Sequence, residues 1–246
     1  MLTYLQEKLI FLSNVLPQEH QFSFKSNFKE LFLKANDGAI LHGVHFAQEN
    51  AKGIILYFHG NRFTADYWGH WGEKLSVDYN YDVVVVDYRG YGKSTGHRSF
   101  NKMLSDGLLF YEYCKKNFPE KEIIIFGRSL GGAFASFTAL YNNPNKLILE
   151  STFTNIGVVA NNKFWGLPVS KVLNYPFQSE NNVQNISVDT YFIHGDNDEL
   201  VMYELGQKLF ELSASKKKKL FTVEGAGHND LQEYSSYFKF LDTIFS

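Results

Sequence analysis

The sequence predicts an α/β fold: a mostly parallel sheet of about eight strands with helices on both faces and a small lid, in one domain spanning residues 1–246. Short unbroken apolar runs, typical of strands buried on both faces, recur along the chain. Amphipathic segments typical of helices separate them, and this alternation favours a parallel sheet. The length of 246 residues and the 44% hydrophobic content suffice for one sizeable core.

Residues 1–27 are predicted to form an N-terminal strap. Leucines recur at spacings of three and four, as on one face of a helix: Leu2, Leu5, Leu9, Leu12 and Leu16. The stretch ends at Pro17 and is shorter than the roughly 20 apolar residues of a membrane span. It also lacks the basic region and cleavage site of a signal peptide. Packing on the domain is favoured over docking on a membrane surface.

Strands and helices are then expected in alternation. A β-hairpin is predicted where two segments flank the turn signal Asn36-Asp37-Gly38. The predicted strands are 28–34, 40–46, 53–58, 83–86, 123–126, 147–149, 190–193 and 220–223. The predicted helices are one starting at Thr64, 103–118, one following Ser129, 200–212 and 231–245.

Residues 152–187 interrupt this alternation. Aromatic residues stand there among Asn, Gly and Pro without a regular period. We interpret the segment as a small lid or insertion rather than a second domain. Three of its aromatic residues are candidates to line an apolar acyl pocket: Phe153, Phe164 and Trp165.

The motif Gly127-Arg128-Ser129-Leu130-Gly131 organises the chain. It fits G-x-S-x-G, and it follows a buried strand and precedes a helix, which is the context of a nucleophile elbow. The glycines allow strand and helix to approach closely, and the sharp turn exposes the serine hydroxyl. A passive serine in a Gly-rich turn is the alternative interpretation.

A serine hydroxyl needs an imidazole to accept its proton and a carboxylate to orient that imidazole. His228 follows the last predicted strand, on a loop with glycines before it. Asp198 is the favoured acid because it lies between a strand and a helix, although it would also suit a helix N-cap. Glu150 and Asp196 remain alternatives, since each follows a strand. The order Ser, Asp, His is the one expected for this architecture.

Two backbone N–H groups are expected to form an oxyanion hole. One belongs to Leu130, after the nucleophile, and the other to Asn61, in the loop after the 53–58 strand. His59, in the same loop, is expected to be a hydrogen-bonded structural residue.

These motifs together resemble the α/β-hydrolase superfamily. The resemblance rests on His59-Gly60-Asn61, 87–94 (DYRGYGKS), the elbow, His194-Gly195-x-x-Asp198 and Gly227-His228. It covers nearly the whole chain from about Phe28, and it implies the α/β-hydrolase fold and a triad of Ser129, Asp198 and His228. Within the superfamily the chain is similar to a small-lid group. That group includes bacterial membrane-associated serine hydrolases, α/β-hydrolase-domain depalmitoylases and prolyl-oligopeptidase-type catalytic domains. Relatives often carry an N-terminal membrane helix, for which this chain begins too late, and a proline where Met202 stands.

The expected function is therefore a cofactor-independent serine hydrolase that cleaves small-molecule or lipid-like acyl esters or thioesters. A peptidase or aminopeptidase, and a non-catalytic binding scaffold, are the alternatives. The net charge of −2 gives no basic field for nucleic acid. The sequence contains no H-E-x-x-H pattern that would indicate a zinc site. The single cysteine, Cys114, fits a reducing compartment, so we expect a cytoplasmic protein with at most weak peripheral membrane contact.

Overall fold

A computed structural model describes residues 2–163 and 173–246. Its eight strands follow the sheet order β1-β2-β4-β3-β5-β6-β7-β8. β1 and β2 pair antiparallel, as do β2 and β4, whereas the pairs β3–β4, β6–β7 and β7–β8 are parallel. The strands are β1 Phe28–Lys34, β2 Ile40–Phe46, β3 Ile54–Phe58, β4 Asp82–Val86, β5 Ile123–Arg128, β6 Lys146–Glu150, β7 Asp189–Gly195 and β8 Lys218–Val223. The predicted fold class is confirmed.

Helices occupy most of the connections between the strands. The α-helices are α1 Leu2–Ile10, α2 Ala65–Tyr79, α3 Phe100–Asn117, α4 Leu130–Leu140, α5 Ile156–Lys163, α6 Ser179–Val183, α7 Tyr203–Leu212 and α8 Ser235–Phe245. The chain divides into two compact units, Met1–Ile125 and Phe126–Ser246, and each is described by itself. No helix among the described residues is both long and apolar enough to cross a membrane.

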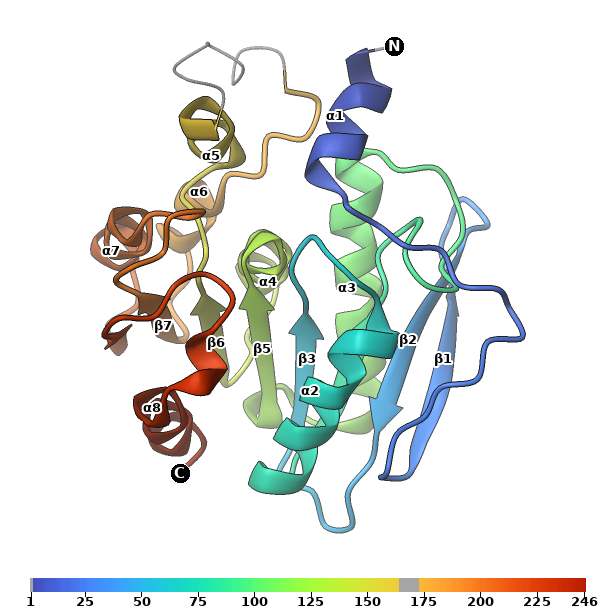
Figure 1. The fold of residues 1–246 in the computed structure, drawn as a ribbon. Helices are drawn as coiled ribbons and strands as arrows, with labels where there is room; N and C mark the ends of the chain where they lie inside the picture. Colours follow the sequence, from blue (N-terminus) through green and yellow to red (C-terminus); the bar gives the residue numbers. More distant parts are fainter. Residues whose placement is uncertain (1, 164–172) are drawn as a thin grey trace. The chain divides into compact units, whose positions relative to one another are not determined.

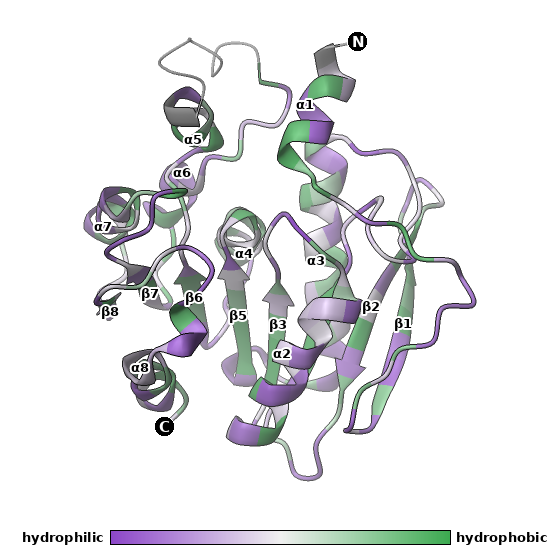
Figure 2. Ribbon diagram, in the orientation of Figure 1, coloured by the Kyte–Doolittle hydropathy of each residue, from purple (hydrophilic) through white to green (hydrophobic). Residues whose placement is uncertain are grey.

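The N-terminal unit is built on the central strands β3 and β4. Every residue of both strands is buried, and β3 is hydrophobic along its length in Figure 2. Helices α2 and α3 cover opposite faces of these strands (Figure 1). Side chains alternate between the faces, so Val85 meets Gly72 of α2, while Gly43 of β2 faces Phe110 of α3.

The N-terminal segment differs from its predicted form. Helix α1 ends at Ile10, whereas the leucine spacing extends to Leu16. The reason is a tertiary hydrogen bond: the N–H of Leu12 donates to the carbonyl of Asn61 at 3.0 Å. Phe11 is buried, but Leu5, Leu9 and other apolar residues of the segment are exposed. The apolar spacing therefore does not mark a buried helix face here.

The C-terminal unit holds the strands β6, β7 and β8 with helices α4, α6, α7 and α8. Strand β6 is an apolar run, as predicted, and Glu150 ends it. Of the predicted lid, the structure describes the short helices α5 and α6. Phe164 and Trp165, predicted to line a pocket, lie outside the described residues, while Phe153 is buried directly after β6.

Two predicted helix starts in this unit are wrong by several residues. The helix predicted over 200–212 begins at Tyr203, because the preceding turn is held by the Asp198 carboxylate rather than by helical hydrogen bonds. The last helix, predicted from 231, begins at Ser235, after a short 3₁₀ turn at Leu231–Glu233. In both segments, backbone N–H groups before the helix form hydrogen bonds with nearby residues rather than within the helix.

Candidate active site

Ser129 sits in a strained turn between β5 and α4. Its φ angle is +53°, in a region that residues other than glycine seldom occupy. The Ser129 N–H donates to the carbonyl of Glu150 at 2.8 Å, which fixes the turn against the end of β6. Strain of this kind collects at functional sites, where the surrounding structure enforces it.

Glycines make this turn possible because strand, helix and the next loop approach each other closely. A Cβ built on Gly127 would lie 2.5 Å from the Ala135 Cβ of helix α4. A Cβ on Gly132 would lie 2.0 Å from Thr152 Oγ1. The spacing of small residues seen in the sequence therefore reflects close packing around the serine.

His228 lies between Ser129 and Asp198. Its Nε2 is 3.1 Å from the Ser129 Oγ, and its Nδ1 is 2.7 Å from Asp198 Oδ2. An ionised carboxylate can only accept hydrogen bonds, so Nδ1 carries the proton and Nε2 is free to accept from the serine hydroxyl. Side chains nearly 100 residues apart thus form one hydrogen-bonded chain.

Asp198 divides its two oxygens between two tasks. Oδ1 accepts the N–H groups of Leu200 at 3.0 Å and of Val201 at 2.8 Å, while Oδ2 faces His228. Burial raises the pKa of this carboxyl, but hydrogen bonds from His194, His228 and the Val201 N–H outweigh burial and hold the pKa well below its usual range. Asp198 is therefore ionised near neutral pH.

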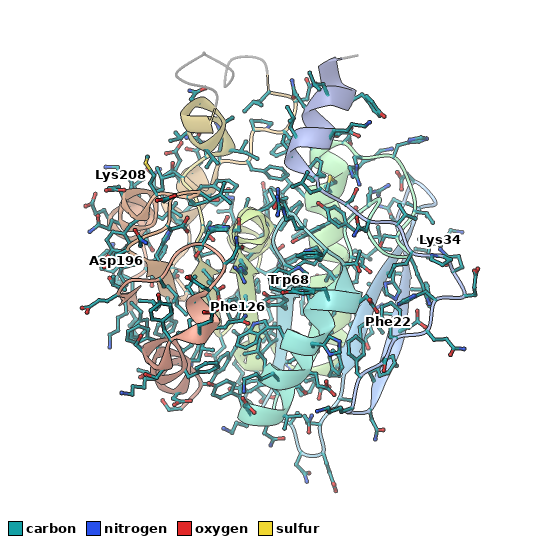
Figure 3. All side chains as sticks on the ribbon, in the orientation of Figure 1. Phe22, Lys34, Trp68, Phe126, Asp196 and Lys208 are labelled. Atoms are coloured by element: carbon teal, nitrogen blue, oxygen red, sulfur yellow. The ribbon has the colours of Figure 1, made fainter. Side chains whose placement is uncertain are left out.

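The two alternative acids have other partners. Glu150 is fully buried, its Oε1 lies 3.3 Å from Arg128 Nε, and its Oε2 accepts the Tyr237 hydroxyl at 2.6 Å. Asp196, labelled in Figure 3, accepts the Gly225 N–H at 2.6 Å. Of the three carboxylates considered, Asp198 is the one that the structure brings to His228.

Two residues beside the hydrogen-bonded chain through His228 have contacts that the sequence does not predict. Arg128 donates from Nη2 to the carbonyl of His228 at 2.7 Å. His194 is buried, with Nε2 2.7 Å from the Val201 carbonyl and 3.3 Å from Asp198 Oδ2. The sequence signals a role for Arg128 only by placing an arginine inside the G-x-S-x-G motif, and it does not identify the partners of that arginine.

The expected oxyanion donors lie in different units. Leu130 begins α4, and the first N–H groups of a helix have no partner within it. Asn61 belongs to the N-terminal unit, where its carbonyl accepts the Leu12 N–H and its side chain donates to the Ile10 carbonyl at 2.9 Å. The role of its N–H stays a prediction.

His59, in the same loop, is fully buried. Its Nδ1 is 2.6 Å from the Gly60 carbonyl, and burial lowers its pKa. A neutral, enclosed imidazole of this kind suits a structural residue. Among the described residues, no group of three or more His, Cys, Asp or Glu side chains could hold a metal ion.

The chain is similar to a known protein family and to individual known proteins. Residues 49–177 match the family model described as serine aminopeptidase, S33. The chain is 34% identical to the lysophosphatidylserine lipase ABHD12 of Danio rerio over 69% of this chain and 49% of that protein. It is 28% identical to the protein bem46 of Schizosaccharomyces pombe over 88% of this chain and 76% of that protein. The chain thus spans about half the length of the ABHD12 relatives it matches.

Solved structures agree on the fold. The esterase Pf2001 of Pyrococcus furiosus has a TM-score of 0.75 at 19% identity, covering 96% of each chain. Acetyl xylan esterase 1 of Thermoanaerobacterium has a TM-score of 0.72 at 18% identity, covering 93% of this chain and 85% of its own. At this level of identity the likeness is one of architecture.

Proposed function

Because this chain belongs to the α/β-hydrolase family described as serine aminopeptidase, S33, we propose that it is a serine hydrolase that cleaves carboxylic esters or thioesters. The observation that carries the proposal is the hydrogen-bonded chain from the Ser129 hydroxyl through His228 to Asp198. This arrangement activates a hydroxyl that is otherwise a weak nucleophile.

In the proposed reaction the Ser129 Oγ attacks the acyl carbonyl carbon while its proton passes to His228 Nε2. The carbonyl oxygen becomes an oxyanion, for which the N–H groups of Leu130 and Asn61 are the proposed donors. Collapse of this intermediate expels the alcohol or thiol, which takes the proton from His228 and leaves an acyl-serine. Water then attacks the acyl carbon, gives its proton to His228, and the acid departs as Ser129 regains its hydrogen.

Asp198 supports both halves of the cycle. Its ionised carboxylate accepts from Nδ1, which keeps Nε2 unprotonated before attack and stabilises the imidazolium afterwards. Each oxyanion donor is expected to contribute about 3–4 kcal/mol to transition-state stability, as in comparable sites. The proposed mechanism uses no cofactor and no metal.

A lipid-like acyl ester is the substrate class we propose first. Support comes from a relative whose name states hydrolysis of a lysophospholipid, and from the aromatic residues of the lid region. The proposed acyl pocket has three members: Phe153, which the structure describes, and Phe164 and Trp165, which lie outside the described residues. A cytoplasmic location with weak peripheral membrane contact belongs to the same proposal.

Hydrolysis of p-nitrophenyl esters of increasing chain length tests the activity. Ser129→Ala should lower kcat by about 10⁴-fold or more and abolish labelling by a fluorophosphonate probe. Ser136→Ala is the matched control, because Ser136 is a buried serine of helix α4, which follows Ser129, and its Oγ donates to the Ala133 carbonyl. Folded wild-type protein that neither turns over esters nor takes the label would favour a non-catalytic scaffold instead.

A peptidase is the second candidate, since the matching family description names an aminopeptidase. Amide and ester substrates with the same acyl group separate the two activities. Preference for an aminoacyl p-nitroanilide over the corresponding ester would replace the esterase proposal with the peptidase one.

A further inference from the structure

An ion pair is buried immediately beside the candidate triad. Arg128 precedes Ser129 in the chain, and its side chain is 6% exposed, while that of Glu150 is fully buried. The Arg128 Nε lies 3.3 Å from Glu150 Oε1, and the Tyr237 hydroxyl donates to Glu150 Oε2 at 2.6 Å. All of these residues belong to the C-terminal unit.

The guanidinium reaches from this pair to the loop that carries His228. Its Nη2 donates to the His228 carbonyl at 2.7 Å and lies 3.4 Å from Asn229 Oδ1. Other hydrogen bonds hold the start of the loop: Gly225 with Asp196 at 2.6 Å, and Asn197 with the Ala226 carbonyl at 3.0 Å. The contact from Arg128 is made at the histidine itself.

Burying two charges is costly, and buried ion pairs are weak sources of stability. A planar guanidinium can nevertheless keep one nitrogen in an ion pair with a carboxylate while another donates to a carbonyl, which the single nitrogen of a lysine cannot do. The geometry of Arg128 therefore suits a side chain that fixes the position of the His228 backbone.

We propose that Arg128 is a positioning residue for the reaction: Glu150 orients its guanidinium, which fixes the backbone of His228 so that the imidazole spans Ser129 and Asp198. The proposal rests on the proposed function for its kinetic consequence. Its structural consequence, a defined hydrogen bond between His228 and Asp198, is independent of turnover.

The test variant is Arg128→Met with Glu150→Gln, which removes both charges and leaves no unpaired one. Displacement of a reacting group by about 1 Å can cost about 100-fold in rate. We therefore expect kcat on a p-nitrophenyl ester to fall by about 10- to 100-fold, with KM within about twofold of wild type. The far-downfield proton NMR signal of His228 Nδ1–H should broaden or disappear.

Lys146→Met is the matched control. Lys146 lies on β6 of the same unit, and its Nζ likewise donates to a backbone carbonyl, that of Ile244 in helix α8 rather than one in the His228 loop. If the substitution of Arg128 only destabilised the fold, it would lower the thermal midpoint, as Lys146→Met would, and it would leave the downfield signal of His228 unchanged. That result would contradict the proposal. We expect the signal and kcat to change only in the Arg128 variant.

A second variant tests the proposal if the double variant does not fold. Arg128→Lys keeps a positive charge opposite Glu150 and loses the planar fork, and it should show the same loss of signal and the same separation of kcat from KM. Unchanged kcat and an unchanged signal in either folded variant would overturn the proposal. Absence of esterase activity in wild type would refute the proposed function, whereas the NMR comparison would still decide the role of Arg128.

Discussion

Asp198 holds His228 through one carboxylate oxygen while the other oxygen holds its own loop. Oδ2 lies 2.7 Å from His228 Nδ1, and Oδ1 accepts two backbone N–H groups. The helix-cap interpretation and the catalytic interpretation of this residue are thus compatible, because they use different atoms.

Asp198→Asn should separate these two tasks. An asparagine oxygen can still accept from Leu200 and Val201, but its NH₂ group would face His228 and favour the tautomer with the proton on Nε2. By analogy with other triads we expect kcat to fall by about 10⁴-fold with the fold retained. Steady-state kinetics and circular dichroism measure the two effects, and near-normal kcat would remove Asp198 from the mechanism.

The lowered pKa of Asp198 predicts acid sensitivity of stability. A carboxyl whose folded pKa is below its unfolded value of about 3.9 stabilises the fold when ionised, and this contribution is lost as pH falls through that value toward the folded pKa. The free energy of unfolding should therefore drop more steeply below about pH 4 in wild type than in Asp198→Asn. Urea unfolding across that range measures both slopes, and parallel slopes would contradict the prediction.

Gly132→Ala should destabilise the elbow. The new Cβ would lie 2.0 Å from Thr152 Oγ1, and such overpacking costs about 1–3 kcal/mol, which exceeds the gain of up to about 1 kcal/mol from higher helix propensity. In the control Gly227→Ala, the nearest atom would be 3.5 Å away, an ordinary contact. Urea unfolding should give Gly227→Ala a clearly larger free energy of unfolding than Gly132→Ala.

The exposed leucines of the N-terminal segment should contribute little to the free energy of unfolding. Leu5 is 55% exposed and Leu9 48% exposed, so serine at both positions should change the free energy of unfolding by about 0.5 kcal/mol or less each. Phe11 is 3% exposed, and Phe11→Ala should cost about 3–5 kcal/mol. Comparable losses in the leucine and phenylalanine variants would mean that the leucines are packed after all.

The sequence predicts the elements whose signal is local. Buried strands such as β3 and β5 are apolar runs, and the elbow carries its own glycines, so the amino-acid pattern alone locates both. It does not locate the end of α1, which depends on a hydrogen bond from Leu12 to Asn61, 49 residues away (61 minus 12). The contact between Arg128 and the His228 carbonyl escapes sequence-based prediction for the same reason, since it joins residues 100 positions apart.

Arg128 and Ser129 are consecutive residues, and one contacts the histidine backbone while the other contacts its ring. If Arg128 positions His228 as proposed, a displacement of the end of β5 should carry the hydroxyl and the imidazole in the same direction. Their separation should then fluctuate less than the position of either group. The distance between Ser129 Oγ and His228 Nε2 should in this way stay short even when the surface loops move.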